Sequence, residues 1–555
     1  MRQCECVSDS LGLRSGVRGK SFAEGGSGVM LEWMGKQKVV NHHNDVPFHV
    51  LERKYSFDAK GKHEEDNGSE NMIIHGDNLV ALKSLLPRYE SRVKCIYIDP
   101  PYNTGNEGWV YNDNVNDPQI KKWLNKVVGK EGEDFSRHDK WLCMMYPRLK
   151  LLQKLLSHDG IIFISIDDTE QARLRLICDE IFGANNFLAN IAWEKRYTRS
   201  NNAKMFYSLK DSILCYRKSP ALSVVKEART EKADSNYANP DNDPRGPWMT
   251  SSYVNPATKE KRPNLVYDIQ SPDGRTVRHP THAWKFSKEE HLRHVAENRL
   301  WWGADGTAKY PRLKNFKAEM PKMVPVDLWK YQDTGTTDDG GNELKAIFGE
   351  MVFDTPKPVS LIERMLKIVS ANNAIVLDSF AGSGTTAHAV LRMNQKDGGD
   401  RKFILIEMMD YADSITAERV KRVIEGYGHG DKRVEGTGGD FSFYELGPQL
   451  MIDGVLNEDV PTEKIREYVW YTETKQPIGE AEKGDAYKLG EAFGVAYYFC
   501  YEKNKSMTLN RALLKKIKTK AESYVVYADA CTLSPEELEK MHITFKKIPR
   551  DVTRF

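Results

Sequence analysis

Lys94-Cys95-Ile96-Tyr97-Ile98-Asp99-Pro100-Pro101-Tyr102 is the stretch of sequence that decides the fold. Its apolar part, Cys95 to Ile98, predicts a short buried strand. Two prolines end that strand, because each lacks a backbone N–H and fixes its own φ. The stretch therefore predicts a carboxylate, a carbonyl and an aromatic ring on a stiff turn at the carboxyl end of a strand. In open α/β sheets, ligands bind at that end.

The turn Asp99-Pro100-Pro101-Tyr102 suits one chemical task, the alkylation of an exocyclic amine on a nucleobase. Such an amine is conjugated with its ring and is therefore a poor nucleophile. If the Asp99 carboxylate and the Pro100 carbonyl accept its two N–H bonds, they draw the lone pair out of conjugation and stabilise the positive charge that builds on nitrogen. Tyr102 would stack on a base that has left its duplex. The alternative is a proline-stiffened loop without a catalytic role.

A second motif, Asp378-Ser-Phe-Ala-Gly-Ser-Gly-Thr-Thr386, predicts a strand that opens through a glycine loop into a helix. It lacks the lysine of a P-loop and the third glycine of the dinucleotide fingerprint. The loop therefore favours a cofactor without phosphate, and S-adenosylmethionine is such a cofactor. Gly382 and Gly384 have no side chains, so the cofactor could approach the backbone closely there. We expect Asp378 to contact the amino-acid portion of this cofactor or an ordered water. Glu407 ends the next predicted strand and is expected to bind the ribose hydroxyls.

With Asn103-Thr104-Gly105 added, the first motif resembles that of DNA amino-methyltransferases, and of the modification (Mod) subunits of type III restriction systems in particular. The resemblance implies that Asp99, Pro100, Pro101 and Tyr102 are catalytic. It also implies a set of cofactor-binding residues, which are Asp77, Lys357, Asp378, Phe380, Gly382, Gly384 and Glu407. The catalytic motif precedes the cofactor motif, an order that resembles the β group of these enzymes.

The resemblance implies a site-specific methyltransferase that moves a methyl group from S-adenosylmethionine to N6 of adenine in double-stranded DNA. Methylation of cytosine N4 stays open, although that group more often has serine in place of Asp99, as do methylation of RNA or a protein amide and a role in guiding a nuclease. The implied partners are a helicase–nuclease restriction subunit and a second copy in a homodimer. The chemistry requires no metal.

The motif order predicts a circularly permuted version of one doubly wound, Rossmann-like α/β sheet. The Asp99 and Asp378 strands should then be neighbours, although about 280 residues separate them in the sequence. Strand–helix alternation supports this fold class. The main predicted strands and helices are a strand that begins at Asn71 and ends in Gly76-Asp77, helix 79–86, helix 141–157, strand 161–167, a helix that is capped by Asp168 or Thr169 and runs to about Phe182, strands 187–193 and 212–216, helix 359–370, strand 402–407 and helix 416–424.

Residues 219–345 lose this alternation and mix tryptophan and tyrosine with lysine and arginine. Aromatic rings and basic groups fit base stacking and phosphate contact, so the segment is predicted to be a target-recognition domain. The alternative is an ordinary small β-rich domain with a charged surface. The expected order is a disordered leader or mis-called start (1–29), the catalytic half (30–218), the recognition domain (219–345), the cofactor-binding half (346–430) and a small C-terminal α/β accessory domain (431–555).

Composition places limits on the function. The net charge is only +2, from 81 basic and 79 acidic residues, so a surface that binds DNA must be local. The eight cysteines contain no Cys-x-x-Cys pair, which argues against a zinc site or a disulfide scaffold. No apolar run approaches the roughly 20 residues of a membrane span. These features predict a soluble, cytoplasmic protein.

Overall fold

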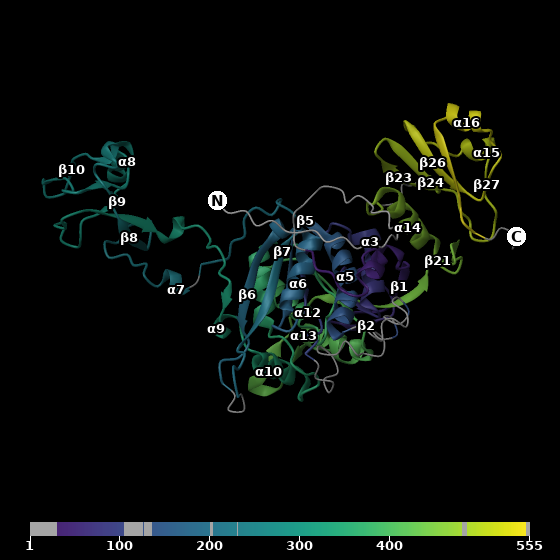
Figure 1. Ribbon diagram of the computed structural model, residues 1–555, viewed down its shortest axis with the longest axis horizontal. Coiled ribbons are helices and arrows are strands. Elements are labelled where there is room, and N and C mark those ends of the chain that lie inside the picture. Colours follow the sequence, from purple (N-terminus) through teal and green to yellow (C-terminus); the bar gives the residue numbers. More distant parts are fainter. Residues whose placement is uncertain are drawn as a thin grey trace, which may run out of the picture.

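The computed structural model describes residues 30–104, 136–199, 204–229, 231–479 and 485–550, together with 122 and 126. The leader expected over residues 1–29 lies outside the described residues. Figure 1 shows a large central sheet with helices around it, the inserted segment in teal on one side, and the C-terminal segment in yellow on the other.

The central sheet has eleven strands in the order β15-β6-β7-β5-β4-β16-β17-β3-β20-β1-β2. From β5 to β20 neighbouring strands are parallel, whereas β7 and β1 run antiparallel to their neighbours in that block. The strands are β1 (His49–Asp58), β2 (Gly61–His63), β3 (Met72–His75), β4 (Val93–Ile98), β5 (Leu156–Ile166), β6 (Phe187–Glu194), β7 (Lys210–Arg217), β15 (Leu328–Trp329), β16 (Ile375–Asp378), β17 (Lys402–Glu407) and β20 (Asp440–Gln449). The predicted α/β class with a mostly parallel sheet is confirmed.

The permuted topology is also confirmed. Strands β4 and β16 are parallel neighbours, with Cys95 opposite Val376 and Ile96 opposite Leu377. Asp99 and Asp378 therefore stand at the carboxyl ends of adjacent strands, which is the edge where such sheets bind ligands.

Helices cover both faces of the sheet because side chains alternate along each strand. On β4, Ile96 and Ile98 belong to one apolar cluster, and Cys95 and Tyr97 belong to the other. The first cluster includes residues of α3 (Asn78–Tyr89), α5 (Arg137–Leu155) and α6 (Gln171–Cys178). The second includes residues of α11 (Val359–Val369), α12 (Thr385–Asp397) and α13 (Glu418–Glu425).

Several boundaries differ from the sequence-based expectation. Helix α3 runs through Pro87 to Tyr89, because a proline in the last turn costs only one helical hydrogen bond. Strand β5 begins at Leu156, where a turn was expected at Asp159-Gly160. Helix α6 follows Glu170, and neither Asp168 nor Thr169 caps it. Shorter elements nearby are α1 (Lys36–Val39), α2 (His42–Asp45), β18 (Gly426–Tyr427) and β19 (Val434–Glu435).

The inserted segment has its own apolar cluster, built largely from aromatic residues such as Tyr253, Trp284 and Trp302. These rings were expected to be available for base stacking, but they are buried, because so small a domain needs them as its core. The main elements are α7 (Glu231–Asp234), β8 (Trp248–Ser252), β9 (Val254–Thr258), β10 (Ile269–Gln270), β11 (Thr276–Val277), β12 (His282–Trp284), α8 (Lys288–Ala296), β13 (Leu300–Trp301) and β14 (Arg312–Phe316).

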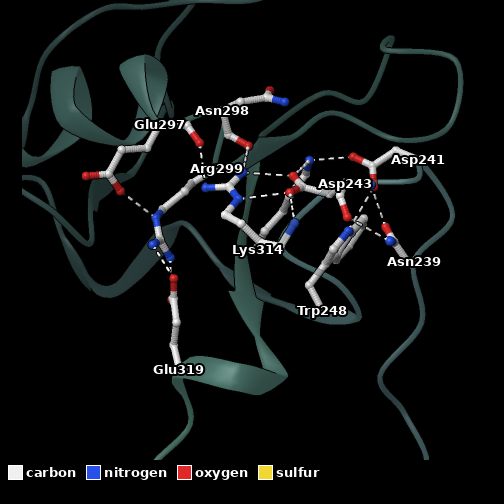
Figure 2. A network of polar contacts seen from close by, with 10 residues as sticks. Asn239, Asp241, Asp243, Trp248, Glu297, Asn298, Arg299, Lys314 and Glu319 are labelled. Carbon is white, nitrogen blue, oxygen red and sulfur yellow. Dashed lines mark hydrogen bonds and ion pairs between the residues drawn. The ribbon is translucent and has the colours of Figure 1, made fainter.

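A network of polar side chains links several segments of this inserted domain (Figure 2). Lys314 on β14 is buried and forms ion pairs with Asp241 and Asp243. The Trp248 ring N–H donates to Asp241 at 2.9 Å. Hydrogen bonds from the Arg245 side chain, with a smaller contribution from Lys314, hold the pKa of Asp243 well below its usual range. Because the buried lysine has two carboxylate partners, the network joins β14 to the segment before β8.

Both ends of the inserted domain are placed differently from the expected limits 219 and 345. Residues 227 and 323 form an antiparallel bridge, with Glu227 N–H donating to the Met323 carbonyl at 2.8 Å. After it, β15, α9 (Tyr331–Thr334) and α10 (Thr337–Phe348) return to the central sheet and its helices. The two segments that connect the inserted domain to the sheet therefore lie side by side at residues 227 and 323.

The C-terminal segment begins later than the expected residue 431, because β20 lies inside the central sheet between β3 and β1. Beyond it, β23, β24, β26 and β28 form a separate four-stranded sheet. Its elements are β21 (Met451–Ile452), β22 (Val455–Leu456), α14 (Thr462–Thr474), β23 (Lys488–Ala492), β24 (Val495–Phe499), β25 (Thr508–Leu509), α15 (Arg511–Leu514), β26 (Ser523–Ala528), β27 (Ala530–Cys531), α16 (Pro535–Lys540) and β28 (Ile543–Lys547). Among the described residues, no helix has the length and apolar character needed to cross a membrane.

Candidate active site at the carboxyl edge of the central sheet

Asp99 of the first motif and residues of the second motif line one small cavity at the ends of β4 and β16. The cavity volume is about 20 Å³. Its lining residues are Tyr97, Asp99, Phe353, Thr355, Pro356, Lys357, Asp378, Phe380, Ala381, Gly382, Ser383, Thr385 and Thr386. The fold thus brings together the carboxylate predicted to be catalytic, the segment around Lys357 and the glycine loop, which are far apart in the sequence.

Asp99 is almost buried and forms an ion pair with the Nζ atom of Lys357. The same Nζ lies 5.3 Å from the centre of the Tyr102 ring, over its face. The sequence assigned Lys357 to the cofactor only, and its pairing with Asp99 was not predicted. The cation therefore stands between the predicted catalytic residues and the predicted cofactor loop.

Tyr102 is buried beside Asp99. Burial, followed by the negative charge of Asp99, raises the pKa of the Tyr102 phenol well above its ordinary value. The phenol is therefore neutral at physiological pH. The backbone next to it is held from outside the turn, since the Trp141 ring N–H on α5 donates to the Pro101 carbonyl at 2.6 Å.

Both carboxylate oxygens of Glu407 accept backbone N–H groups. Oε2 accepts from Gly382 at 2.8 Å, and Oε1 accepts from Met409 at 3.0 Å. The Thr416 hydroxyl donates to the Gly382 carbonyl at 2.6 Å. The carboxylate predicted to bind ribose thus also holds the glycine loop.

Asp378 is buried at the end of β16 and accepts two hydrogen bonds from its own loop. The Phe380 N–H donates to Oδ1 at 3.1 Å and the Thr386 hydroxyl donates to Oδ2 at 2.6 Å. Burial, with a contribution from the charge of Asp99, raises the pKa of Asp378 to about 7. Asp378 therefore shapes the loop, whatever further contact it makes.

The loop requires glycine at position 384, where φ is +80°. A Cβ atom there would lie 3.0 Å from the Thr416 carbonyl oxygen. Gly382 also has a positive φ, of +52°. Phe380 is buried in the same apolar cluster as the β4 residues Ile96 and Ile98. These features let the backbone of the loop form an open edge of the cavity with little side-chain bulk.

Asp77 does not line this cavity. It follows β3, which lies beyond β17 from β16. Its carboxylate caps α3 by accepting from Leu79 N–H at 2.7 Å, and Arg148 lies 3.6 Å away. The structure therefore gives Asp77 a capping role, and its expected contact with the cofactor stays a prediction.

Sequence reasoning missed Arg419, which is fully buried under the glycine loop. Its Nη1 donates to the Thr385 hydroxyl at 2.7 Å and to the Ser383 hydroxyl at 2.9 Å. Burial lowers the pKa of its guanidinium to about 10. A signal was present in the sequence, because Arg419 precedes Val423 by one helical turn and so falls on the apolar face of α13.

A family model described as DNA methylase matches residues 93–418. That range contains both motifs and more than half of the chain. The chain belongs to the DNA methylase family. Its known relatives include the StyLTI Mod subunit of Salmonella typhimurium, a type III restriction-modification enzyme, which is 32% identical over 73% of this chain and 64% of its own length.

Another relative of this methylase is the EcoPI Mod subunit of Escherichia phage P1, 32% identical over 68% of this chain and 63% of its own length. The chain thus spans less than two thirds of the length of these two relatives. Among solved structures, the PvuII DNA methyltransferase, described as cytosine-N4-specific, matches with a TM-score of 0.32 and 13% identity over 63% of this chain and 86% of that one.

Proposed function

We propose that this methylase transfers a methyl group from S-adenosylmethionine to N6 of an adenine flipped out of duplex DNA at a specific site. One observation carries the proposal. Asp99, the first residue of the turn, and the glycine loop, far apart in the sequence, line one cavity at the ends of adjacent strands. A methyl donor on the loop would therefore face an amine held by Asp99. The relatives named as Mod subunits support the same reading.

The residues of the loop fit this cofactor. S-adenosylmethionine supplies an electrophilic methyl group when it is bound. The loop offers a backbone edge without bulk at Gly382 and Gly384, where an added Cβ at 384 would meet Thr416. Lys357 supplies a cation near the cavity that suits the carboxylate of the cofactor. Phe380, Asp378 and Glu407 shape the loop, and Asp77 stands at the neighbouring strand end.

The catalytic turn acts on the target amine. The Asp99 carboxylate and the Pro100 carbonyl accept the two N–H bonds of the amine and stabilise the positive charge that develops as the methyl group is transferred. Pro101 keeps the turn stiff, and Tyr102 stacks on the base. An aspartate at position 99 favours adenine over cytosine, in line with the resemblance described above.

We assign site recognition to the inserted domain and leave the C-terminal domain an accessory role. The aromatic core of the inserted domain is buried, so its exposed lysines and arginines are the groups that would contact DNA. The basic residues concerned are Lys259, Lys261, Arg262, Arg275, Arg278 and Lys285. By analogy with the Mod relatives, a helicase–nuclease subunit and a second copy of the chain are the proposed partners, and the cytoplasm is the proposed location.

The test is expression of the wild-type chain and of Asp99→Ala in a host that lacks DNA methylation, followed by sequencing that reports modified bases. We expect N6-methyladenine at one short motif in the wild type and none in the variant. The purified variant should bind S-adenosylmethionine with an affinity close to that of the wild type in calorimetry. N4-methylcytosine would overturn the choice of base. Methylation at the wild-type level by Asp99→Ala would overturn the assignment of Asp99 as a catalytic residue.

A further inference from the structure

Glu170 is a buried carboxylate beside the catalytic turn for which the sequence predicted no role. It has no exposed surface and stands immediately before α6, with its own carbonyl accepting from Leu174 N–H at 2.8 Å. A carboxylate is rarely buried completely unless it is paired, so its partners are informative.

The partners of Glu170 lead directly to the catalytic turn. Its Oε1 accepts a hydrogen bond from the side-chain amide of Asn103, and the His138 ring nitrogen Nδ1 contacts the same oxygen. The Arg173 guanidinium lies 3.5 Å from Oε2. Three segments, namely the turn after β4, the first turn of α5 and the start of α6, therefore meet at one carboxylate.

Asn103 is the residue that follows Tyr102, and its backbone is unusual. Its φ is +60°, in the left-handed region, which asparagine adopts more readily than most residues with a side chain, and its side chain is buried. The hydrogen bond from its amide to Glu170 ties this backbone conformation to the start of α6. The chain direction after Tyr102 is therefore fixed by a contact from outside the turn.

A second constraint acts on the other side of the aromatic ring. The Trp141 ring N–H binds the Pro101 carbonyl, so the backbone is held both one residue before and one residue after Tyr102. Both constraints come from α5 and α6, the helices on one face of the sheet. The turn is thus held by side chains that do not line the cavity.

We propose that Glu170 is a positioning residue for methyl transfer: through Asn103 it holds Tyr102 and the Pro100 carbonyl in the geometry that receives the target amine. The inference rests on the proposed function. Small errors in the placement of a reacting group are costly, and a displacement of 1 Å can lower a rate about 100-fold. Glu170 contributes no atom to the reaction, and a variant at this position keeps the Tyr102 ring for stacking, so its effect should appear mainly in kcat.

The experiment compares Glu170→Ala, Glu170→Gln, Asn103→Ala and the double alanine variant in steady-state methylation of unmethylated genomic DNA. We expect Glu170→Ala to lower kcat about 100-fold while KM for DNA and the Kd for S-adenosylmethionine stay within about threefold of wild type. Glu170→Gln keeps an oxygen that can accept from Asn103 and should recover much of the rate. The double variant should be no slower than the slower single variant, because both act through one contact.

Glu363→Gln is the matched control. Glu363 on α11 is also a buried carboxylate with basic partners, Arg392 and Lys396, but it lies away from the turn. We expect this variant to lower Tm and to leave kcat near wild type. An equal loss of kcat in the control, additive effects in the double variant, or a loss confined to KM would each overturn the positioning role.

A crystal structure of Glu170→Ala separates this inference from the proposed function. We expect Asn103 to leave the left-handed region and Tyr102 to shift relative to β4. An unchanged turn from residue 99 to residue 103 would overturn the inference even if methylation is established. If the wild-type chain transfers no methyl group to any DNA, the proposed function fails, and the crystal structure alone decides whether Glu170 holds the turn.

Discussion

The residues proposed as catalytic contact a side chain of opposite charge and a buried aromatic ring. Asp99 pairs with Lys357, whose ammonium group also lies over the Tyr102 ring. Under the proposed function, the target amine would either share the Asp99 carboxylate with the Lys357 ammonium group or displace that group. The buried carboxylate is already oriented as a hydrogen-bond acceptor, and water is excluded around it. Exclusion of water strengthens the electrostatic contacts that such a group makes in a transition state.

At Tyr102 the ring and the hydroxyl can be tested separately. Tyr102→Ala removes the surface on which the base would stack, and because stacking is worth about 1–3 kcal/mol per base, KM for DNA should rise about tenfold or more. Tyr102→Phe keeps the ring and should change KM by less than about threefold. Steady-state methylation with unmethylated DNA measures both. If Tyr102→Phe raises KM for DNA as much as Tyr102→Ala does, then the Tyr102 hydroxyl beside Asp99, and not the ring, is the group that binds DNA.

The buried carboxyl of Asp378 makes stability depend on pH. Its pKa is about 7 in the folded protein, against an ordinary value of 3.8 for an aspartate carboxyl, so the folded state holds the proton more tightly. The resulting stability is complete below pH 3.8 and is lost as the pH rises to about 7. Asp378→Asn stays neutral, so its stability relative to wild type should rise by about 1 kcal/mol per pH unit between pH 5 and pH 7.

Melting temperatures of Asp378→Asn and wild type at pH 5, 6, 7 and 8 measure this difference. The lost acceptor for the Thr386 hydroxyl adds an offset that does not depend on pH. The gap between the two curves should shift in favour of the variant up to pH 7 and then stay constant. Parallel curves over the whole range would show that the carboxyl is ionised throughout.

The glycine loop is the element on which cofactor binding is expected to depend. Its conformation is set by backbone contacts to Glu407 and Thr416 and by Arg419 beneath it. The sequence shows which residues are glycine, but the groups that hold them come from β17, from the turn before α13 and from α13 itself. A loop held from three sides presents one fixed backbone edge to a ligand.

Gly384→Ala tests this element, with Gly349→Ala as its control. Both glycines have positive φ, +80° and +89°, so each variant should lose about 1 kcal/mol of stability. A Cβ at position 384 meets the Thr416 carbonyl at 3.0 Å, whereas one at position 349 has open space. Only Gly384→Ala should raise the Kd for S-adenosylmethionine, by about tenfold or more, equivalent to ~1.4 kcal/mol. Calorimetry measures this Kd. If both variants bind S-adenosylmethionine with the same affinity, the glycine loop is not part of the cofactor site.

Over the whole molecule, the central sheet is completed by residues from beyond the matched family region. Strand β20 pairs with β3 on one side and with β1 on the other, and its Phe441 and Phe443 are buried. Without β20, both neighbouring strands would lose a partner and expose open edges. Burial of the two rings alone is worth about 3–6 kcal/mol.

Two truncations follow from this arrangement. A chain that ends at residue 430 should aggregate, whereas a chain that ends at residue 452 keeps β20 and should remain folded and bind S-adenosylmethionine. Size-exclusion chromatography and a thermal melt of each purified chain distinguish these outcomes. A folded, monodisperse chain ending at residue 430 would show that β20 is dispensable and that the accessory domain begins where the composition changes.

Much of the fold was predictable because its signals are local. The apolar run before Asp99, the two prolines, and the glycines after Asp378 act on their own backbone, so the two motifs and their place at strand ends could be read directly. The order of the motifs, interpreted through the family resemblance, also predicted that β4 and β16 are neighbours. In the inserted segment, composition showed aromatic residues but could not show that Tyr253, Trp284 and Trp302 are buried.

The sequence by itself thus determined the α/β class, the permuted order, and which residues form the candidate catalytic turn and cofactor loop. Only the tertiary structure decided that Lys357 pairs with Asp99, that Glu170 holds Asn103, that Arg419 lies under the loop, and that β20 closes the sheet. The reason is physical. Proline and glycine restrict or free the backbone where they stand, whereas a buried charge finds its partner only after distant elements have packed and excluded water between them.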